Sequence, residues 1–262
     1  INGFQSPHPA RPCRYVDVRV IDNSTLAVLA SSATDANGFF SIAVTDALVR
    51  NVAILAVTQS ANVANLNYTV THWNTGAFYS YQGILVGSHD PNADIGMGAV
   101  TAHYRAGGEP FNLYDASFDA NDCIGSMQGG TRPTAYNIRY ALDVANDQAY
   151  WNGVVNIGGN FGYDDTILLH ETGHCMSSKY GGWSDSPGGG HYFEDNAQDP
   201  RLSWGEGWPT FFGSNVRDWA GYNRSDVYLN STGDSTTGVI SFSYTLETPP
   251  PGLGLGASSE VA

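Results

Sequence analysis

Five consecutive residues, His170-Glu171-Thr172-Gly173-His174, have the types and spacing that a hydrolytic metal site requires. On a helix, residues four apart share one face, so the two imidazoles can bind a single zinc ion. Glu171 can then reach a water molecule on the metal, whose pKa falls to about 7. The carboxylate would accept a proton as that water attacks a carbonyl carbon and return it to the leaving amine. The pattern predicts zinc-dependent hydrolysis with His170 and His174 as ligands and Glu171 as general base.

A third protein ligand is needed, because a catalytic zinc ion usually has three protein ligands and one open position. Metzincins place a Gly and a third His at fixed offsets after this pattern, where the present chain has Ser177 and Tyr180. The candidates that remain are Glu206, Glu194 and His191. Glu194 follows a glycine-rich stretch that is typical of a loop, and ordering a loop costs entropy. We therefore favour Glu206 as the third ligand.

The surroundings of Glu206 contain a conflict. Ser203 to Glu206 resembles a helix capping box, followed by the apolar pair Phe211-Phe212. Pro209 would lie too deep in a helix that begins at Ser203, so we expect the helix to begin nearer Glu206 or to be kinked. In a capping box the carboxylate of Glu206 would bind the backbone, and we favour the metal instead.

The stretches Leu168–His174 and Trp204–Phe212 together resemble the gluzincin metallopeptidases, the clan of the thermolysin-like and aminopeptidase-N-like enzymes. The resemblance covers about residues 150–215. It implies zinc bound by His170, His174 and Glu206, with Glu171 as base. The interval between His174 and Glu206 is longer than in either family, so an insertion around residues 186–191 is expected to loop out. The aminopeptidase motif Gly-x-Met-Glu-Asn is absent, which favours endopeptidase over aminopeptidase action.

Gluzincins also use a downstream Tyr or His to stabilise the oxyanion. The candidates here are Tyr222, Tyr228, Tyr244 and His191, of which Tyr222 and His191 are our catalytic assignments. A zinc-binding histidine usually has a carboxylate on its other ring nitrogen. The residues that could serve are Asp195, Asp199 and Asp218.

The helix that must carry the two histidines has clear boundary signals. Asp164 or Asp165 can cap its N-terminus, apolar residues 167–169 can anchor it, and Gly181-Gly182 can end it. Gly173 costs about 1 kcal/mol relative to alanine inside a helix. That cost is tolerable if another backbone passes close to this position, as often happens beside a metal.

The first third of the chain is predicted to be β. Residues 15–22 and 39–44 alternate in polarity around the turn cluster Thr34–Gly38, and residues 52–57 form an apolar run. Residues 13–70 resemble the transthyretin-like, carboxypeptidase-regulatory-like domains attached to many secreted enzymes. The resemblance implies a small β-sandwich with an accessory role.

The predicted fold class is α+β with two domains. Residues 1–105 are expected to form the β-sandwich, and residues 106–262 a zincin-like domain with a mixed sheet and zinc-binding helices. Within the second domain we expect a short helix at 116–123 and strands at 136–140 and 153–157. Residues 258–262 look like the first turn of an interrupted helix, so we expect this domain to be incomplete at its C-terminal end.

Composition limits the partners. The chain has 25 acidic and 11 basic residues and a formal charge of −14, which disfavours nucleic acid. It has no apolar run of about 18 residues, so no membrane span is expected. Scarce lysine and abundant Gly, Asn, Ser, Thr and Tyr favour a secreted, cell-surface or periplasmic protein. Cys13 and Cys123 are candidates for a disulfide. The oligomeric state is not predicted.

The substrate is therefore expected to be an extracellular protein or peptide. The alternative is a non-catalytic binding or adhesion module with a structural or vestigial metal site. Glu171 argues against that alternative, because a structural zinc site needs no base. Calcium is a further option at the acidic clusters Asp90–Asp94 and Asp119–Asp122, although we favour solvated turns there.

Overall fold

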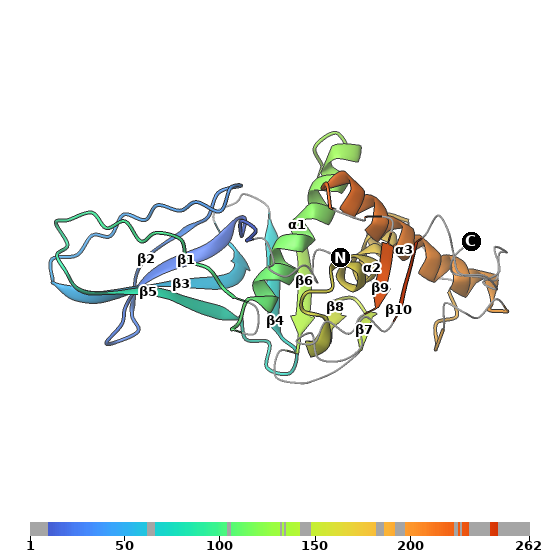
Figure 1. Cartoon of the computed structure of the whole chain (residues 1–262), viewed down its shortest axis with the longest axis horizontal. Coiled ribbons are helices and arrows are strands. Elements are labelled where there is room, and N and C mark those ends of the chain that lie inside the picture. The colour runs from blue at the N-terminus through green and yellow to red at the C-terminus, as the bar shows by residue number, and fades with distance from the viewer. Residues whose placement is uncertain are drawn as a thin grey trace. The chain divides into compact units, whose positions relative to one another are not determined.

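The computed structural model describes residues 10–61, 66–103, 106–131, 133, 135–141, 148–181, 186–191, 197–222, 225, 227–230 and 242–245. The protein is α+β, with a mixed sheet and helices α1, α2 and α3 (Figure 1). Two compact units are present. Of the described residues, the β unit comprises those within 10–115 and 133–141, and the helical unit comprises those within 116–131 and 148–245. They divide inside α1 (Glu109–Met127), and the domain boundary near residue 105 stays a prediction.

The β unit is organised around strand β3, the longest strand of the described chain. β3 pairs antiparallel with β1, β4 and β5, while β2 lies on the other side of β1. β4 pairs with β6 in parallel, which makes the sheet mixed. The bounds are β1 Val16–Asp22, β2 Val28–Ala33, β3 Arg50–Ser60, β4 Asn67–His72, β5 Ser80–His89 and β6 Ala135–Tyr140. Alternate apolar side chains of β1 and β3, such as Val18 and Ile54, are buried in its core.

The strands expected at 15–22 and 52–57 are confirmed as β1 and β3, but the strand expected at 39–44 is wrong. That segment has no regular structure, and β1 pairs instead with β2, which precedes the turn cluster. Phe39 is 73% exposed, so its alternating pattern does not mark a buried face. The turn itself forms as expected. Asp35 accepts hydrogen bonds from the backbone of Asn37 and Phe39, and Gly38 has φ of +76°.

The helical unit contains the two helices that carry the predicted metal ligands. Strands β7 (Ala149–Trp151) and β8 (Val155–Ile157) pair antiparallel and are followed by a 3₁₀ turn at Gly159–Phe161 and by α2 (Asp165–Met176). A π-helical turn, Ser177–Gly181, extends α2. After α3 (Pro200–Trp219), strands β9 (Val227–Asn230) and β10 (Phe242–Thr245) pair antiparallel. The strand expected at 136–140 is confirmed as β6, and the one expected at 153–157 is shorter, because β8 begins at Val155.

Helix α1 is longer than the helix predicted at 116–123, and it also corrects the interpretation of one acidic cluster. Residues 119–122 lie inside α1 and do not form a solvated turn. Asp119 is buried and accepts a hydrogen bond from the hydroxyl of Tyr222. Asp90, by contrast, does cap a turn, because its carboxylate accepts from the backbone and side chain of Asn92.

Three further sequence predictions concern the cysteines, a membrane span and the C-terminal end. Cys13, Cys123 and Cys175 are free thiols, so the disulfide considered between Cys13 and Cys123 is not formed. No described helix is long and apolar enough to cross a membrane. The interrupted helix expected at residues 258–262 lies outside the described residues.

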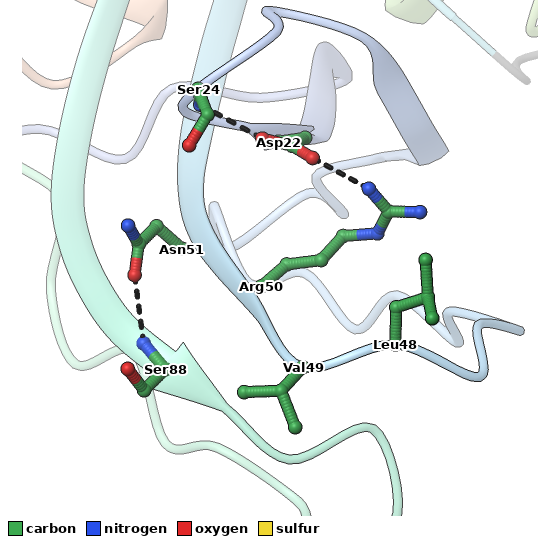
Figure 2. Close-up of a pocket in the computed structure, with 7 residues that line it drawn as sticks. All are labelled: Asp22, Ser24, Leu48, Val49, Arg50, Asn51 and Ser88. Carbon is green, nitrogen blue, oxygen red and sulfur yellow. Dashed lines mark hydrogen bonds and ion pairs between the residues drawn. The ribbon is translucent and has the colours of Figure 1, made fainter.

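Figure 2 shows a surface pocket of the β unit, at the start of β3. Asp22 accepts a hydrogen bond from the backbone N–H of Ser24 and pairs with the guanidinium of Arg50 at 2.6 Å. The side-chain oxygen of Asn51 accepts from the backbone N–H of Ser88. These polar groups satisfy one another, and the pocket contains none of the residues that the sequence assigns to catalysis.

Candidate metal centre

Helix α2 begins where the sequence predicts. The side chain of Asp164 is the N-cap and accepts hydrogen bonds from the backbone N–H groups of Thr166 and Ile167, both at 3.1 Å. Asp165 adds a negative charge to the first turn, which favours the positive end of the helix dipole. Leu168 and Leu169 are fully buried and hold the helix in the unit. This anchoring fixes the turn that carries His170, Glu171 and His174.

Helix α3 begins earlier than either start that we expected. Its N-cap is Asp199, whose carboxylate accepts from the backbone N–H of Arg201 at 2.8 Å, and Pro200 occupies the first helical turn. An Asp followed by a Pro is a strong start, because proline has no N–H to satisfy and its φ is already helical. Ser203 therefore lies within the helix and is not its cap. The carboxylate of Glu206 is therefore not needed to cap the N-terminus of α3.

Two glycines allow α2 and α3 to pack closely (Figure 1). A Cβ atom added at Gly173 would lie 2.6 Å from Cα of Pro209, and one added at Gly213 would lie 3.2 Å from the backbone of Leu169. Leu169 precedes Gly173 in α2, whereas its neighbour Gly213 follows Pro209 in α3. The two helices are therefore antiparallel where they touch. The backbone that passes close to Gly173 is thus that of Pro209.

Gly173→Ala is expected to destabilise the protein although alanine is the better helix former. Alanine gains about 1 kcal/mol of helix propensity, whereas overpacking a core costs about 1–3 kcal/mol. The clash here is with backbone, which cannot rotate away, so the free energy of unfolding should fall by about 2 kcal/mol. Chemical denaturation measures this change.

Gly205→Ala on α3 is the matched control, because its new Cβ would meet only side-chain atoms of Ser186, at 3.2 Å. We expect that control to change stability by less than about 1 kcal/mol. Equal stability of the wild type and Gly173→Ala would contradict the close helix contact.

The three predicted ligands come together at this contact. Oε2 of Glu206 lies 3.2 Å from Nε2 of His170 and 3.1 Å from Nε2 of His174. The imidazole rings are perpendicular, with centroids 4.9 Å apart. One ligand atom from each residue lies within 4.8 Å of the others, and no further group of three His, Cys, Asp or Glu side chains does so among the described residues. This group, called the His-His-Glu group below, could hold a metal ion.

Thr210 fixes the tautomer of His170. Its hydroxyl donates to the backbone oxygen of Glu206 at 3.2 Å and lies 2.9 Å from Nδ1 of His170. A threonine hydroxyl has one proton, so at Nδ1 it must accept, and Nδ1 must carry the imidazole proton. In the neutral ring Nε2 then presents a lone pair to the carboxylate of Glu206. Two facing lone pairs repel each other, and either a second proton on the ring or a bound metal ion would relieve that repulsion.

Charge and burial in the His-His-Glu group are also consistent with a bound cation. Glu206 is buried, which by itself raises the pKa of its carboxyl group. The two imidazoles beside it outweigh this effect and hold the pKa below its usual value. Glu206 therefore stays ionised, as a metal ligand must. The set of two imidazoles and one carboxylate is a known catalytic zinc ligand set.

Glu171 is a buried acid with an unused oxygen. Its side chain lies in the same turn as the two histidines, and its Oε2 has no hydrogen-bond partner. Burial raises the pKa of the carboxyl group, and the nearby histidines oppose this without cancelling it. Leaving a buried polar atom without a partner costs free energy. Such a group is suited to take a proton from a molecule that enters the site.

The other predicted site residues have different positions. His191 approaches the His-His-Glu group through Glu206, with Nε2 3.5 Å from Oε2. The hydroxyl of Tyr222 donates to Asp119 at 2.5 Å, and its role as oxyanion stabiliser stays a prediction. Tyr228 and Tyr244 lie on β9 and β10, whose side chains are not described there. Glu194, the rival third ligand, lies outside the described residues.

Sequence reasoning missed the residue that supports His170. Asp199 caps α3 and Asp218 accepts a hydrogen bond from Ser225, while Asp195 lies outside the described residues. The supporting residue is Thr210, one helical turn after Glu206. Residues four apart lie on one helix face, so the spacing from Glu206 could have revealed it.

Neither the protein-family models nor the curated proteins include a match to this sequence. The function is therefore inferred from the site itself.

Proposed function

We propose that the protein is a zinc-dependent peptidase of gluzincin type, with His170, His174 and Glu206 as metal ligands and Glu171 as general base. The observation that carries this proposal is the buried oxygen Oε2 of Glu171, which has no hydrogen-bond partner, beside the His-His-Glu group. A structural metal site gains nothing from such a carboxylate, because its four ligands already complete the coordination. A hydrolytic site needs it.

The residues have distinct roles in the proposed reaction. A zinc ion held by the His-His-Glu group would supply a Lewis acid that polarises the substrate carbonyl and lowers the pKa of water to about 7. Glu171 accepts one proton from the attacking water as its oxygen bonds to the carbonyl carbon. Glu171 then gives that proton to the leaving amine as the C–N bond breaks, so a carboxylic acid and an amine result. Thr210 holds the ring of His170 in the tautomer that can bind metal.

We also propose that the helical unit has a zincin-like fold. A zincin-like helical unit is supported by the antiparallel contact of α2 and α3, which brings ligands from the two helices together. We further propose that the β unit is an accessory β-sandwich and that the protein acts on extracellular proteins or peptides. Its scarce lysine and its abundant Gly, Asn, Ser, Thr and Tyr support export.

Metal analysis with an activity assay tests the proposal. We expect about one zinc ion per chain after purification, and hydrolysis of an unfolded protein such as casein. Removal of the metal by a chelator should lower the rate at least about 100-fold, because the Lewis acid is worth several kcal/mol. Zinc should restore the rate and magnesium should not, since magnesium prefers oxygen ligands.

Three results would contradict the proposal in different ways. Stoichiometric iron in place of zinc would assign the group to the two-His, one-carboxylate iron sites. Bound zinc without hydrolysis of any peptide would favour the binding-module alternative. If the protein takes up no metal at all, the proposed mechanism is wrong.

A further inference from the structure

Large aromatic side chains are exposed on one side of α3. Trp204, Phe211 and Trp219 are 52%, 57% and 48% exposed, and Trp208 is half-buried. The ring of Trp208 lies 5.9 Å from that of Phe211, measured between their centroids. Exposed apolar residues are common singly, whereas several large rings on one surface are typical of a binding interface.

Helical periodicity explains why these residues share one side of α3. Successive residues are about 100° apart around a helix, so positions 204, 208, 211, 215 and 219 fall within about 80°. Asn215, the polar member, donates a side-chain N–H to the backbone oxygen of Phe211 on its own helix, at 2.9 Å. The aromatic face is defined by these five residues: Trp204, Trp208, Phe211, Asn215 and Trp219.

The aromatic face is separate from the metal centre. Glu206 follows Trp204 by two residues and therefore lies about 200° from it around the helix axis. The side of α3 that packs on α2 contains Pro209 and Gly213, which are close to the backbone of that helix. A molecule that covers the aromatic face therefore need not disturb the His-His-Glu group.

Opposite charges flank the aromatic face at equal distances from its middle. Arg201 lies seven residues before Trp208, and Asp218 lies seven residues after Phe211. Both residues are exposed, and the side chain of Arg201, which pairs with Asp199 at 2.9 Å, is 57% exposed. The charged residues of α3 that lie between them, Glu206 and Arg217, are buried. The face thus has an uncharged aromatic centre and a charged rim, as protein interfaces do.

We propose that the aromatic face is the contact of a homodimer, in which α3 of two chains packs antiparallel about a two-fold axis. The axis passes between Trp208 and Phe211, so Trp208 of one chain lies against the partner's Phe211. The same axis places Arg201 opposite the partner's Asp218, and the reverse pair forms by symmetry. A parallel arrangement would instead place like charges opposite each other.

A second copy is the occupant that this distribution of charge favours. The chain has a formal charge of −14, which by itself keeps copies apart. Self-association therefore requires a contact whose centre is uncharged and whose charges pair with their opposites, and the aromatic face meets both conditions. Exposed ion pairs contribute little affinity, so the rings provide the binding free energy and the pair of Arg201 with Asp218 sets the orientation.

Sedimentation of the full chain tests the dimer. We expect the wild type to be dimeric at about 100 μM, where a contact with a micromolar Kd is almost fully formed. Phe211→Ala should weaken dimerisation at least about thirtyfold, because central aromatic residues provide most of the affinity of an interface. Phe39→Ala, at a phenylalanine of the β unit that is 73% exposed, is the matched control and should dimerise like the wild type. Circular dichroism checks that the variants are folded.

An exchange of charges tests the antiparallel arrangement. Arg201→Asp and Asp218→Arg should each weaken the dimer several-fold, because each places like charges opposite each other. The variant with both substitutions restores opposite charges at the same two places and should dimerise like the wild type. A contact held by the rings in any other orientation would show no such recovery.

The results that overturn the inference are distinct from failure of the proposed function. A wild-type chain that is monomeric at about 100 μM, or a dimer that Phe211→Ala leaves intact, would exclude this contact. A double charge variant no tighter than the single ones would exclude the antiparallel pairing. A monomer whose tryptophan fluorescence shifts with phosphatidylcholine vesicles would assign the face to a membrane instead. The zinc content and the rate of hydrolysis are measured separately, because the aromatic face contains no metal ligand.

Discussion

Glu171→Gln is expected to abolish peptide hydrolysis while the protein stays folded and keeps its zinc ion. Glutamine has nearly the same shape as glutamate but cannot accept the proton of the attacking water. General base catalysis contributes about 10²–10⁴-fold, so the rate constant should fall by at least about 100-fold. A fluorogenic peptide assay measures the rate, and mass spectrometry of the metal measures the bound zinc.

The environment of Glu171 makes this variant informative. The residue is 7% exposed and its Oε2 has no partner, so the substitution breaks no hydrogen bond at that oxygen. Burial also raises the pKa of the carboxyl group, so the neutral amide should fit without loss of stability. Glu109→Gln is the matched control, since Glu109 is also buried but belongs to the β unit. If Glu171→Gln hydrolyses peptides at the wild-type rate, the proposed mechanism is wrong.

Glu206→Gln is expected to release the metal. The amide is neutral and a poor ligand, and the lone pair of His170 would no longer face an anion. Loss of residues that only support a metal ligand costs about 10–100-fold in affinity, so loss of a ligand should weaken zinc binding by more than about 100-fold. Titration with a competing chelator measures the affinity, and far-ultraviolet circular dichroism checks that α3 remains folded.

The same titration decides between the two glutamates considered as third ligand. If Glu206 binds the metal, Glu194→Gln should bind zinc as tightly as the wild type. If zinc affinity falls in Glu194→Gln and not in Glu206→Gln, the assignment made here is wrong. Glu171→Gln serves as the control with unchanged ligands.

Local sequence signals were sufficient for the chemistry on α2. The spacing of His170 and His174 needs only a helix to become a ligand pair, and Asp164 starts that helix as predicted. Such signals act within one or two turns, where geometry follows directly from chain periodicity. For the same reason the apolar runs of β1 and β3 could be recognised without knowledge of their partners.

Signals that depend on distant parts of the chain were misread or missed. The alternating segment at 39–44 had the period of a strand, but pairing with β1 went to β2. At α3, Ser203 and Glu206 matched a capping box, yet the pair Asp199-Pro200 begins the helix four residues earlier than Ser203 would. Tertiary contacts decide which of two competing local signals the chain follows, because they stabilise only one of the alternatives.

The sequence by itself determined the reactive group: two imidazoles one turn apart with a glutamate between them, and Glu206 as the favoured third ligand. Only the tertiary structure decided how Glu206 reaches them. Gly173 and Pro209 let α2 and α3 touch, and that approach places one oxygen of Glu206 against both rings while Thr210 orients His170. The tertiary structure also decided that His191 approaches Glu206, because Ser186 of the same segment packs against Gly205. Periodicity sets which residues share a helix face, whereas the distance between faces depends on how two helices pack, which no single segment encodes.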